Sequence, residues 1–467
     1  MVLDPRNIFR GIEPGGITIV AVSGGSDSLA LLLLAHAWAQ EKDITLHAVT
    51  VDHGLRPESA AEAAFVASIC DALDVDHTTL GWEGVKPQSG ISDAARRARY
   101  NLIEEFALDI GCDMILAAHT SDDQAETVYM RLKRELLESA RNLSEETDTE
   151  QDSGLRQATT VSLGRGMAGM SRISLLPGGT VLVRPLLGVT RKALRDYLSS
   201  FPQSWIEDPT NDDEAYERVR VRKLLASQPG RKKDILAFTS LMARMRGVLS
   251  RDTAMLLEIA AGVTPGPVYT VQLAKLSLAP RPVALHALQV LIAVAGGGEH
   301  LPSRASLETL AAALIDGRQA RGTIGGVVIE RSGDVLRLFR ELRNLRSMHI
   351  AAGETAIWDG RLEIINSGNR SIHVAPLTRR GLADLETERG KLPNTRPRAA
   401  LLSTPVIHIA GGGLFLPLVE SGGEPPRLYT RVTARAIEQF CPQTDFPVLD
   451  WLRELDGARK ACLLPRH

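Results

Sequence analysis

The sequence predicts an α/β protein: a doubly wound parallel sheet, followed by a mostly helical middle domain and a small C-terminal α+β domain. In residues 1–135, apolar runs of strand length alternate with helical patterns, as in a parallel sheet covered by helices. Residues 231–318 are rich in Ala, Leu and Arg and have a helical pattern. Residues 347–467 are rich in Gly and Pro and contain short strand signals, which favours a small α+β module.

The elements of the first domain are expected in strict alternation. We predict strands at residues 17–22, 44–51, 77–80 and 114–118, and helices at residues 27–40, 59–73, 92–108 and 122–138. A strand at 180–183 is followed by a helix from Thr190, a good N-cap residue, and by a charged helix at 216–225. Polar residues follow three of these strands. In an open parallel sheet, the carboxyl ends of the strands share one ligand-binding crevice, so we expect these polar residues to face it.

A chain of 467 residues is too long for a single hydrophobic core, and changes in pattern divide it into three predicted domains. The α/β domain is expected at residues 1–228, with an acidic insertion at about residues 135–165 that has the composition of a mobile loop. The helical domain is expected at residues 229–345, where residues 323–339 alternate like a β-hairpin. The third domain comprises residues 346–467.

The composition is that of an ordinary soluble protein, with 44% hydrophobic and 24% charged residues. No apolar stretch reaches the length of a membrane span, and the N-terminus lacks a signal-peptide core, so we expect a cytoplasmic protein with no membrane partner. Cys70, Cys112, Cys441 and Cys462 form no C-x-x-C pair, which argues against a zinc ribbon, an iron–sulfur site or a local redox pair. The sequence carries no signal for an oligomeric state.

The net charge of −2 conceals a strong asymmetry along the chain. Residues 1–220 contain 21 Lys and Arg against 34 Asp and Glu, a net charge of −13, whereas residues 221–467 contain 33 against 22, a net charge of +11. This distribution is compatible with a nucleic acid that the basic half binds and presents to the acidic half. Two ordinary solvated surfaces would explain the same distribution.

The most informative segment lies between the first predicted strand and the first long helix. It consists of Ser23, Gly24, Gly25, Ser26, Asp27 and Ser28. Glycines allow close approach of the backbone, and the N–H groups of a helix N-terminus favour a phosphate. Asp27 stands where a carboxylate can hold a Mg²⁺ ion that bridges phosphates. The segment lacks the Walker A pattern, and a simple turn is the alternative interpretation.

Two clusters follow that could contact a nucleotide or RNA. His53 and Arg56 come directly after the second predicted strand, where the base or ribose of a nucleotide usually lies. Arg96 and Arg99 share one face of the next helix and could neutralise a polyphosphate or an RNA backbone. A turn histidine and a solvated arginine face are the alternatives.

His119, Asp123 and Glu126 form the fourth cluster, at the end of a strand and the start of a helix. The two carboxylates are three residues apart and project from one helical face, so they could bind an ammonium group and accept its proton. For the neighbouring Asp122, a helix cap is the favoured interpretation.

The fifth cluster follows the segment Asp208-Pro209-Thr210-Asn211. Arg218 and Arg222 share one face of the charged helix, whereas Arg220 points elsewhere. A phosphate or a flipped nucleotide is a plausible ligand for this pair, and intrahelical pairing with Glu214 and Glu217 is the alternative.

Taken together, these motifs resemble those of the tRNA(Ile)-lysidine synthetases, members of the ATP-pyrophosphatase (PP-loop) superfamily. Residues 23–28 match the pyrophosphate loop, residues 52–56 match an HGLR-type segment, and residues 90–100 are similar to G-I-x-x-x-A-R-x-x-R-Y. Residues 118–127 resemble A-H-H-x-D-D-Q-x-E-T, with Thr120 in place of the second histidine. Residues 184–187 (R-P-L-L) and 208–211 (D-P-T-N) complete the set. The resemblance covers about residues 1–225.

The resemblance implies an adenine nucleotide alpha hydrolase-like fold with ATP and Mg²⁺ as cofactors. In this family, ATP adenylates the wobble cytidine of an isoleucine tRNA with a CAU anticodon, and the side-chain amine of L-lysine then displaces AMP to give lysidine. The implied domains are a catalytic domain at residues 1–228, a tRNA-binding domain at residues 229–345 and a tRNA-recognition domain at residues 346–467.

The resemblance also implies roles for individual residues. The catalytic residues would be Asp27, Arg99, His119, Asp123 and Glu126, with Asp27 also holding Mg²⁺. The ATP-binding residues would be Ser23, Gly24, Gly25, Ser26, Asp27, Ser28 and His53. The residues that contact tRNA or lysine would be Arg56, Asp123, Glu126, Asn211, Arg218 and Arg222.

Three other functions are compatible with parts of the sequence. A PP-loop sulfurtransferase that thiolates tRNA shares the loop, but it needs a cysteine to carry sulfur, and neither Cys70 nor Cys112 lies in a polar cluster. A synthetase of the amidotransferase type needs an ammonia source, and no glutaminase domain is evident. An RNA-binding protein with a decayed loop would not be expected to keep Asp27, His119, Asp123 and Glu126.

Overall fold

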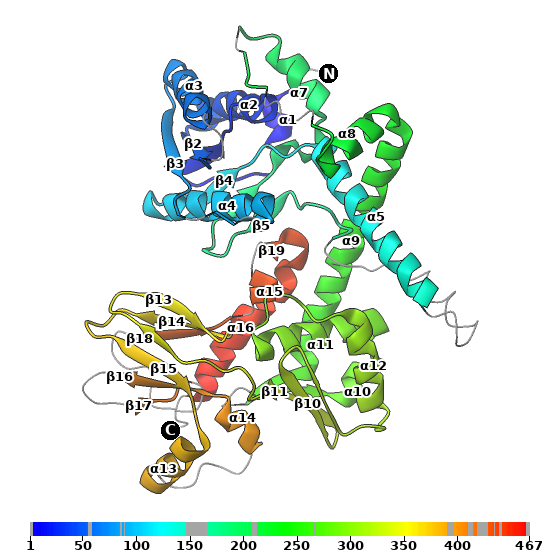
Figure 1. The fold of residues 1–467 in the computed structure, drawn as a ribbon, viewed down its shortest axis with the longest axis vertical. Coiled ribbons are helices and arrows are strands. Elements are labelled where there is room, and N and C mark those ends of the chain that lie inside the picture. The colour runs from blue at the N-terminus through cyan, green and yellow to red at the C-terminus, as the bar shows by residue number, and fades with distance from the viewer. Residues whose placement is uncertain are drawn as a thin grey trace. The chain divides into compact units, whose positions relative to one another are not determined.

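The structure is a computed structural model that divides into two compact units. It describes residues 3–54, 58–84, 86–87, 89–145, 166–202, 204–207, 213–264, 268–389, 397–409, 414–417, 428–433, 435–438 and 441–463. The first unit comprises Met1–Gly247 and Pro442–Thr444, and the second comprises Val248–Cys441 and Asp445–His467 (Figure 1). In the described ranges, we find no helix that combines the length and apolarity needed to cross a bilayer.

The first unit is built on a mainly parallel sheet, as predicted. Its strands lie in the order β19-β5-β6-β4-β1-β2-β3, and β6, β4, β1, β2 and β3 are parallel to their neighbours in that series. The predicted strands correspond to β1 (Ile17–Ala21), β2 (Thr45–Asp52), β3 (Asp76–Gly81), β4 (Met114–Leu116) and β6 (Val181–Val183). Two strands of this sheet were not predicted, the antiparallel β5 (Ile173–Leu175) and the two-residue edge strand β19 (Cys441–Pro442).

Helices connect the strands and cover the sheet, with α2 and α4 on opposite sides (Figure 1). The predicted helices are present as α2 (Ser26–Lys42), α3 (Ser59–Ala72), α4 (Ile91–Asp109), α5 (Ser121–Glu145), α7 (Arg191–Leu198) and α8 (Glu217–Ser227). The long α9 (Pro229–Ala260) follows, and two short helical segments lie at α1 (Pro5–Ile8) and η1 (Pro185–Gly188).

The acidic insertion begins later than predicted. We expected a loop from about residue 135, but α5 continues to Glu145. The reason is local: the segment from Glu135 to Glu145 is rich in Leu, Glu, Ala and Arg, which are strong helix formers. The remainder of the predicted insertion, up to residue 165, lies outside the described residues.

The core of the first unit fixes the position of the later helices relative to the first loop. Ile19 and Val20 of β1 are fully buried, as expected for a central strand covered on both faces. The leucines of α2 belong to the same hydrophobic cluster as Leu194 and Leu198 of α7. This packing places the start of α7 beside the start of α2, although the two helices are far apart in the sequence.

The middle region is mostly helical, as predicted, and also contains a sheet. Its helices are α10 (Leu273–Leu278), α11 (Arg281–Gly296) and α12 (Arg304–Ile315), which follow α9. The predicted hairpin is formed by β10 (Val327–Ser332) and β11 (Val335–Arg340). It belongs to a five-stranded sheet with β9 (Arg321–Ile324), β8 (Val268–Gln272) and β7 (Ala261–Thr264), strands that the sequence analysis did not predict.

The last part of the chain has the predicted α+β character. One sheet contains β12 (Met348–Ile350), β15 (Ile372–Pro376), β16 (Pro405–Ile409) and β17 (Leu414–Phe415), and the other contains β13 (Thr355–Trp358), β14 (Leu362–Asn366) and β18 (Leu428–Val432). The helices are α13 (Arg379–Arg389), α14 (Arg398–Leu402), α15 (Arg435–Glu438) and α16 (Phe446–Leu463). Asp359 forms buried ion pairs with Arg340 and Arg361 at 3.1 and 2.7 Å, and so joins this part to β11.

Candidate active site

The loop between β1 and α2 has the geometry of a phosphate cradle. The N-cap residue of α2 is Gly25, which has no side chain to cap the helix, so the first N–H groups of α2 are left to bind an anion. The Ser28 hydroxyl accepts the N–H of Ser23 at 3.1 Å and donates to the carbonyl of Gly25 at 3.0 Å. These two bonds hold the loop closed around the helix N-terminus.

Gly24 is required by both its backbone conformation and its surroundings. Its φ of +81° lies in the left-handed region, and its carbonyl accepts the N–H of Ile206 at 2.9 Å. A Cβ at this position would lie 2.5 Å from Cδ1 of Ile206. The loop is therefore packed directly against the segment that contains Ile206.

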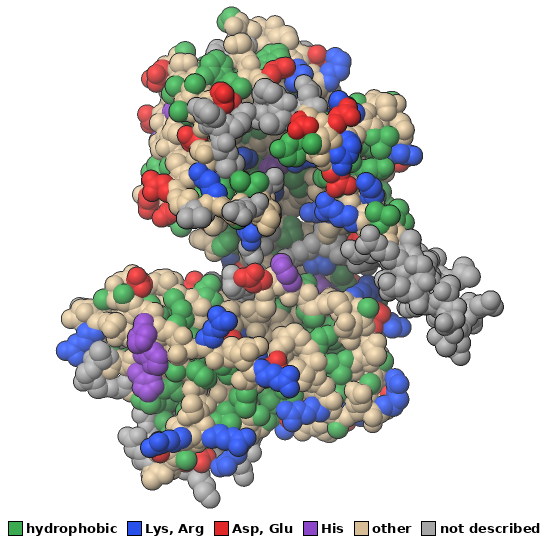
Figure 2. Space-filling model, in the orientation of Figure 1, with side chains coloured by type: hydrophobic (Ala, Val, Ile, Leu, Met, Phe, Trp, Pro, Cys, Tyr) green, Lys and Arg blue, Asp and Glu red, His purple; other side chains and the backbone are tan. Residues whose placement is uncertain are grey.

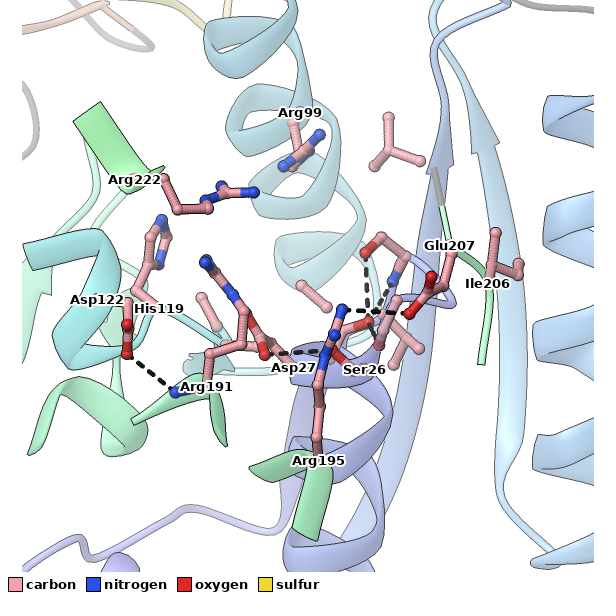
Figure 3. A pocket seen from close by; sticks show the side chains of 18 of the residues that line it. Ser26, Asp27, Arg99, His119, Asp122, Arg191, Arg195, Ile206, Glu207 and Arg222 are labelled. Carbon is pink, nitrogen blue, oxygen red and sulfur yellow. Dashed lines mark hydrogen bonds and ion pairs between the residues drawn. The ribbon is translucent and has the colours of Figure 1, made fainter. Parts of the chain in front are cut away.

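A cavity of about 790 Å³ opens in front of this loop. Its walls include the ends of β1, β2 and β4, together with Arg99 from α4, Arg191 and Arg195 from α7, and Glu207 (Figure 3). This volume lies within the usual range for a small-molecule pocket. The predicted crevice at the carboxyl ends of the strands is therefore present.

Three carboxylates and three arginines meet at one side of this cavity. Arg191 contacts Asp27 (Nε–Oδ2, 2.9 Å), Asp123 (Nη2–Oδ1, 3.0 Å) and Glu126 (Nη1–Oε1, 3.5 Å). Arg218 binds Asp123 at 2.8 Å and Glu126 at 2.7 Å. Glu126 also accepts from Nε of Arg222 at 2.9 Å and is only 1% exposed. We call these six residues the carboxylate–arginine cluster.

Two acids of the cluster, Asp27 and Asp123, have pKa values that are shifted in opposite directions. Burial raises the pKa of Asp27, and the charge and hydrogen bond of Arg191 only partly oppose this effect. Burial also acts to raise the pKa of Asp123, but Arg191, Arg218 and the hydrogen bonds from Thr120 outweigh it, so the net shift is downward. Asp123 is therefore a stable anion and a weak base, whereas the charge of Asp27 is less well compensated.

Thr120 and Asp122 hold the start of α5 in place. The backbone N–H of Thr120 donates to Oδ2 of Asp123 at 2.9 Å, and the N–H of Asp123 donates to the Thr120 hydroxyl at 3.3 Å, as in a capping box. The hydroxyl of Thr120 also donates to Oδ2 of Asp123 at 2.7 Å. Asp122 accepts the backbone N–H of Arg191 at 2.9 Å and Nζ of Lys232 at 2.6 Å. Asp122 therefore caps α7 rather than its own helix.

Two partly buried histidines lie beside arginines and are neutral at pH 7. Nε2 of His53 lies 3.1 Å from Nη2 of Arg99, and burial followed by the Arg99 charge lowers the pKa of His53 to about 4. Nε2 of His119 lies 3.4 Å from Nη1 of Arg96, and burial, followed by the charges of Arg184 and Arg96, lowers its pKa to about 3. Nδ1 of each ring is buried and finds no partner in the described part of the chain. These nitrogens are suited to a hydrogen bond with a bound substrate.

The structure brings together all the predicted site residues that it describes. The cavity is lined by Ser23, Gly25, Ser26, Asp27, Ser28, Arg99, His119 and Arg222. The predicted residues that lie behind this lining and contact it are Gly24, His53, Asp123 and Glu126. Arg218 is connected to the lining through Asp123 and Glu126. Arg56 and Asn211 lie outside the described residues.

Arg191 is the central residue that the sequence analysis missed. It stands at the first position of α7, where the helix dipole disfavours a positive charge (Figure 3). An arginine directly after the Thr190 N-cap is unfavourable unless carboxylates from other elements lie beside it. Its position was therefore the signal that could have identified Arg191. The predicted orientation of the α8 arginines is confirmed, because Arg218 and Arg222 reach Glu126 whereas Arg220 bonds to the carbonyls of residues 214 and 215.

The strand–loop–helix cradle without a Walker A sequence defines an ATP-binding protein of the PP-loop class, and the model of the PP-loop domain matches residues 13–228. The chain is 38% identical over 457 residues to the tRNA(Ile)-lysidine synthase of Mesorhizobium japonicum, covering 97% of this chain and 94% of that protein. It is 35% identical over 460 residues to the enzyme of the same name from Brucella ovis, covering 96% of each. The chain belongs to the tRNA(Ile)-lysidine synthase family.

Solved structures also include a similar protein. The U34-tRNA thiolase NcsA from Methanococcus maripaludis, determined with its [4Fe-4S] cluster, matches 51% of this chain and 78% of its own, with 16% identity and a TM-score of 0.37.

Proposed function

We propose that this chain ligates L-lysine to the wobble cytidine of the CAU-anticodon isoleucine tRNA at the expense of ATP, which yields lysidine, AMP and pyrophosphate. The observation that carries the proposal is the position of the carboxylate–arginine cluster on the same cavity as the phosphate cradle. The names of the relatives that match nearly the whole chain support it.

In the first step, the carbonyl oxygen of the cytidine attacks the α-phosphorus of ATP, and the bond to pyrophosphate breaks. The loop at residues 23–28 and the N-terminus of α2 hold the phosphates. Arg99, which lines the cavity, offsets the charge that develops on the phosphoryl oxygens. His119 is neutral at pH 7, so it contributes a hydrogen bond rather than a positive charge.

Asp27 fits the role of a Mg²⁺ ligand. Among the described residues, no three His, Cys, Asp or Glu side chains converge as a metal cage. Mg²⁺ in nucleotide sites commonly takes one or two carboxylates together with substrate phosphates, so a single acid beside the cradle suffices. The poorly compensated charge of Asp27 favours a further cation there. Such an ion would neutralise part of the phosphate charge.

In the second step, the side-chain nitrogen of lysine attacks the activated ring carbon, and the carbon–oxygen bond to AMP breaks. Asp123 and Glu126 hold the incoming ammonium group in exchange for part of their arginine contacts. Because the pKa of Asp123 is lowered, we assign Asp123 to binding and orientation of the ammonium group. The ammonium group loses a proton to solvent water before its nitrogen attacks.

The remaining predicted contacts concern tRNA. Arg222 lines the cavity, and Arg218 lies behind it on the same face of α8; this pair can neutralise a phosphate near the reacting nucleotide. We assign Arg56 and Asn211 to the same substrate. The net charge of +11 in residues 221–467 supports tRNA binding by the regions 229–345 and 346–467, and a cytoplasmic location accords with this substrate.

Thiolation of tRNA is disfavoured by the state of the cysteines. Burial raises the pKa of Cys70 to about 11 and also raises the pKa of Cys112, so both thiols are poor nucleophiles at neutral pH. Neither lines the cavity, and Cys441 is buried as well.

Incubation of the chain with ATP, Mg²⁺, bulk tRNA and labelled lysine tests the proposal. We expect AMP release that requires tRNA, together with incorporation of lysine into tRNA. Asp27→Asn should abolish both, whereas Asp109→Asn, an exposed acid at the end of α4, should change neither. AMP formation at the wild-type rate in Asp27→Asn would refute the role of Asp27. Incorporation of cysteine-derived sulfur in place of lysine would refute the function itself.

A further inference from the structure

Three histidines form a row across the four-stranded sheet of the second unit, far along the chain from the residues of the cavity. His349 of β12 lies directly opposite His373 of β15, and His373 lies directly opposite His408 of β16. Side chains alternate between the two faces of a strand, so residues paired in this way share one face. Their chain neighbours Val374 and Ile407 are buried on the other face. The histidine row therefore lies on the solvent side of the sheet.

The rings of the row are close together and tilted relative to one another. The ring centroids of His349 and His373 are 4.6 Å apart, with an angle of 34° between the planes, and those of His373 and His408 are 5.8 Å apart, with an angle of 33°. His349 and His408 are exposed, and His373 between them is half-buried. A continuous patch of histidine is visible on the surface near β15 and β16 (Figure 2).

Each ring of the row brings imidazole nitrogens to the same face of the sheet. A neutral imidazole keeps a lone pair on one nitrogen, which is the form that binds metal ions. Adjacent imidazolium ions would repel one another, whereas a metal ion would attract the lone pairs of adjacent neutral rings.

We propose that His349 and His373 form an open binding site for a divalent transition metal of the Ni²⁺, Cu²⁺ or Zn²⁺ type, completed by water. Imidazole nitrogen is a preferred ligand of these ions, at about 2.0–2.1 Å for Zn²⁺. Residues directly opposite on antiparallel strands have Cβ atoms about 4.5–5.5 Å apart, so rotation of the two side chains alone can turn a nitrogen of each ring towards one ion. Because the rings face solvent, this rotation requires no change in the backbone.

The site is open rather than caged. In the part of the chain that the structure describes, no group of three His, Cys, Asp or Glu side chains is arranged to hold an ion. His408 adjoins His373 on the side away from His349, so it is too far along the row to complete the same coordination sphere. The metal would thus be exchangeable, and the sheet would not depend on it for folding.

Calorimetric titration of the full chain with NiCl₂ in a chelator-free buffer at neutral pH tests the site. We expect one binding event that is lost in His373→Ala and in His349→Ala but retained in His300→Ala, an exposed histidine elsewhere in the same unit. Cu²⁺ should bind more tightly than Ni²⁺ or Zn²⁺. Circular dichroism of each variant checks that the fold is intact.

The result that overturns the proposal is equal Ni²⁺ binding by wild type and folded His373→Ala, or no binding by wild type. A second result would also overturn it: if His373→Ala binds Ni²⁺ normally but binds tRNA more weakly in the presence of EDTA, the row is a surface on which bases stack rather than a metal site. Lysine incorporation should be unchanged in His373→Ala, so failure of this inference is separate from failure of the proposed function.

Discussion

The replacement of Gly24 by alanine separates two physical demands on the phosphate loop. The first is the backbone: a non-glycine residue at φ +81° costs about 1–2 kcal/mol. The second is contact, because the new Cβ would lie 2.5 Å from Cδ1 of Ile206, and overpacking of this kind costs about 1–3 kcal/mol. We therefore expect Gly24→Ala to lower the free energy of unfolding of the first unit by about 2–5 kcal/mol.

The double variant Gly24→Ala/Ile206→Val isolates the contact. Valine lacks Cδ1, and the next atom of Ile206, Cγ1, would be 3.4 Å from the new Cβ, which is tolerable. The double variant should thus recover the stability that the close contact costs, about 1–3 kcal/mol, but not the stability that the backbone conformation costs. Because the two residues touch, their effects should be clearly non-additive.

Gly25→Ala is the matched control. Gly25 has a φ of −75°, and a Cβ there would meet no atom closer than 3.9 Å, so the fold should tolerate alanine. Scanning calorimetry of the full chain gives the stabilities, and about 2–4 °C is expected per kcal/mol for a unit of this size. If Gly24→Ala and Gly25→Ala unfold at the same temperature, or if Ile206→Val fails to restore stability, the account of the loop is wrong.

Three further predictions concern ionisable side chains. Glu126→Gln removes the negative charge and one of the two acceptor oxygens that several guanidinium groups share, and it should cost about 3 kcal/mol and abolish lysine incorporation, whereas the exposed Glu105→Gln should do neither. Wild-type stability in Glu126→Gln would contradict this role of the carboxylate–arginine cluster. The free energy of unfolding should rise with pH between about 4 and 6.5, because unfolded His53 binds a proton below its ordinary pKa of 6.5 while the folded ring stays neutral down to about 4, so stability is full above this window and is lost as the pH falls through it. His53→Gln should reduce this slope, and an unchanged pH profile would refute the assignment. Asp359→Asn leaves Arg361 buried without its ion pair and should destabilise the second unit by about 3–5 kcal/mol without changing the affinity for ATP, and a shift in that affinity would show that the effect is not local.

Most of the first unit could be predicted because its signals are local. The run at residues 17–22, the Gly/Ser turn and the apolar helix that follows occupy neighbouring positions, so hydrophobic pattern and turn chemistry suffice to identify them. The polar clusters after β1, β2 and β4 could be assigned to one crevice, because the carboxyl ends of parallel strands lie at one edge of the sheet.

The elements that the sequence analysis missed or misplaced have two different causes. The strands β5 and β7 are short, and they are stabilised by pairing with β6 and β8 rather than by their own composition. The start of the acidic insertion was misplaced because strong helix formers outweigh a change in charge pattern at the end of α5.

The sequence by itself determined the phosphate loop, the class of fold and the acids and arginines available for chemistry, because each depends on residue types at short spacing. Only the tertiary structure decided how those charges are paired. Arg191 meets Asp27 from 164 positions away, since the packing of α7 against α2 brings the two helix starts together. Burial of the cluster then decides which carboxylate is a stable anion and which attracts a further cation, and burial depends on the folded chain as a whole.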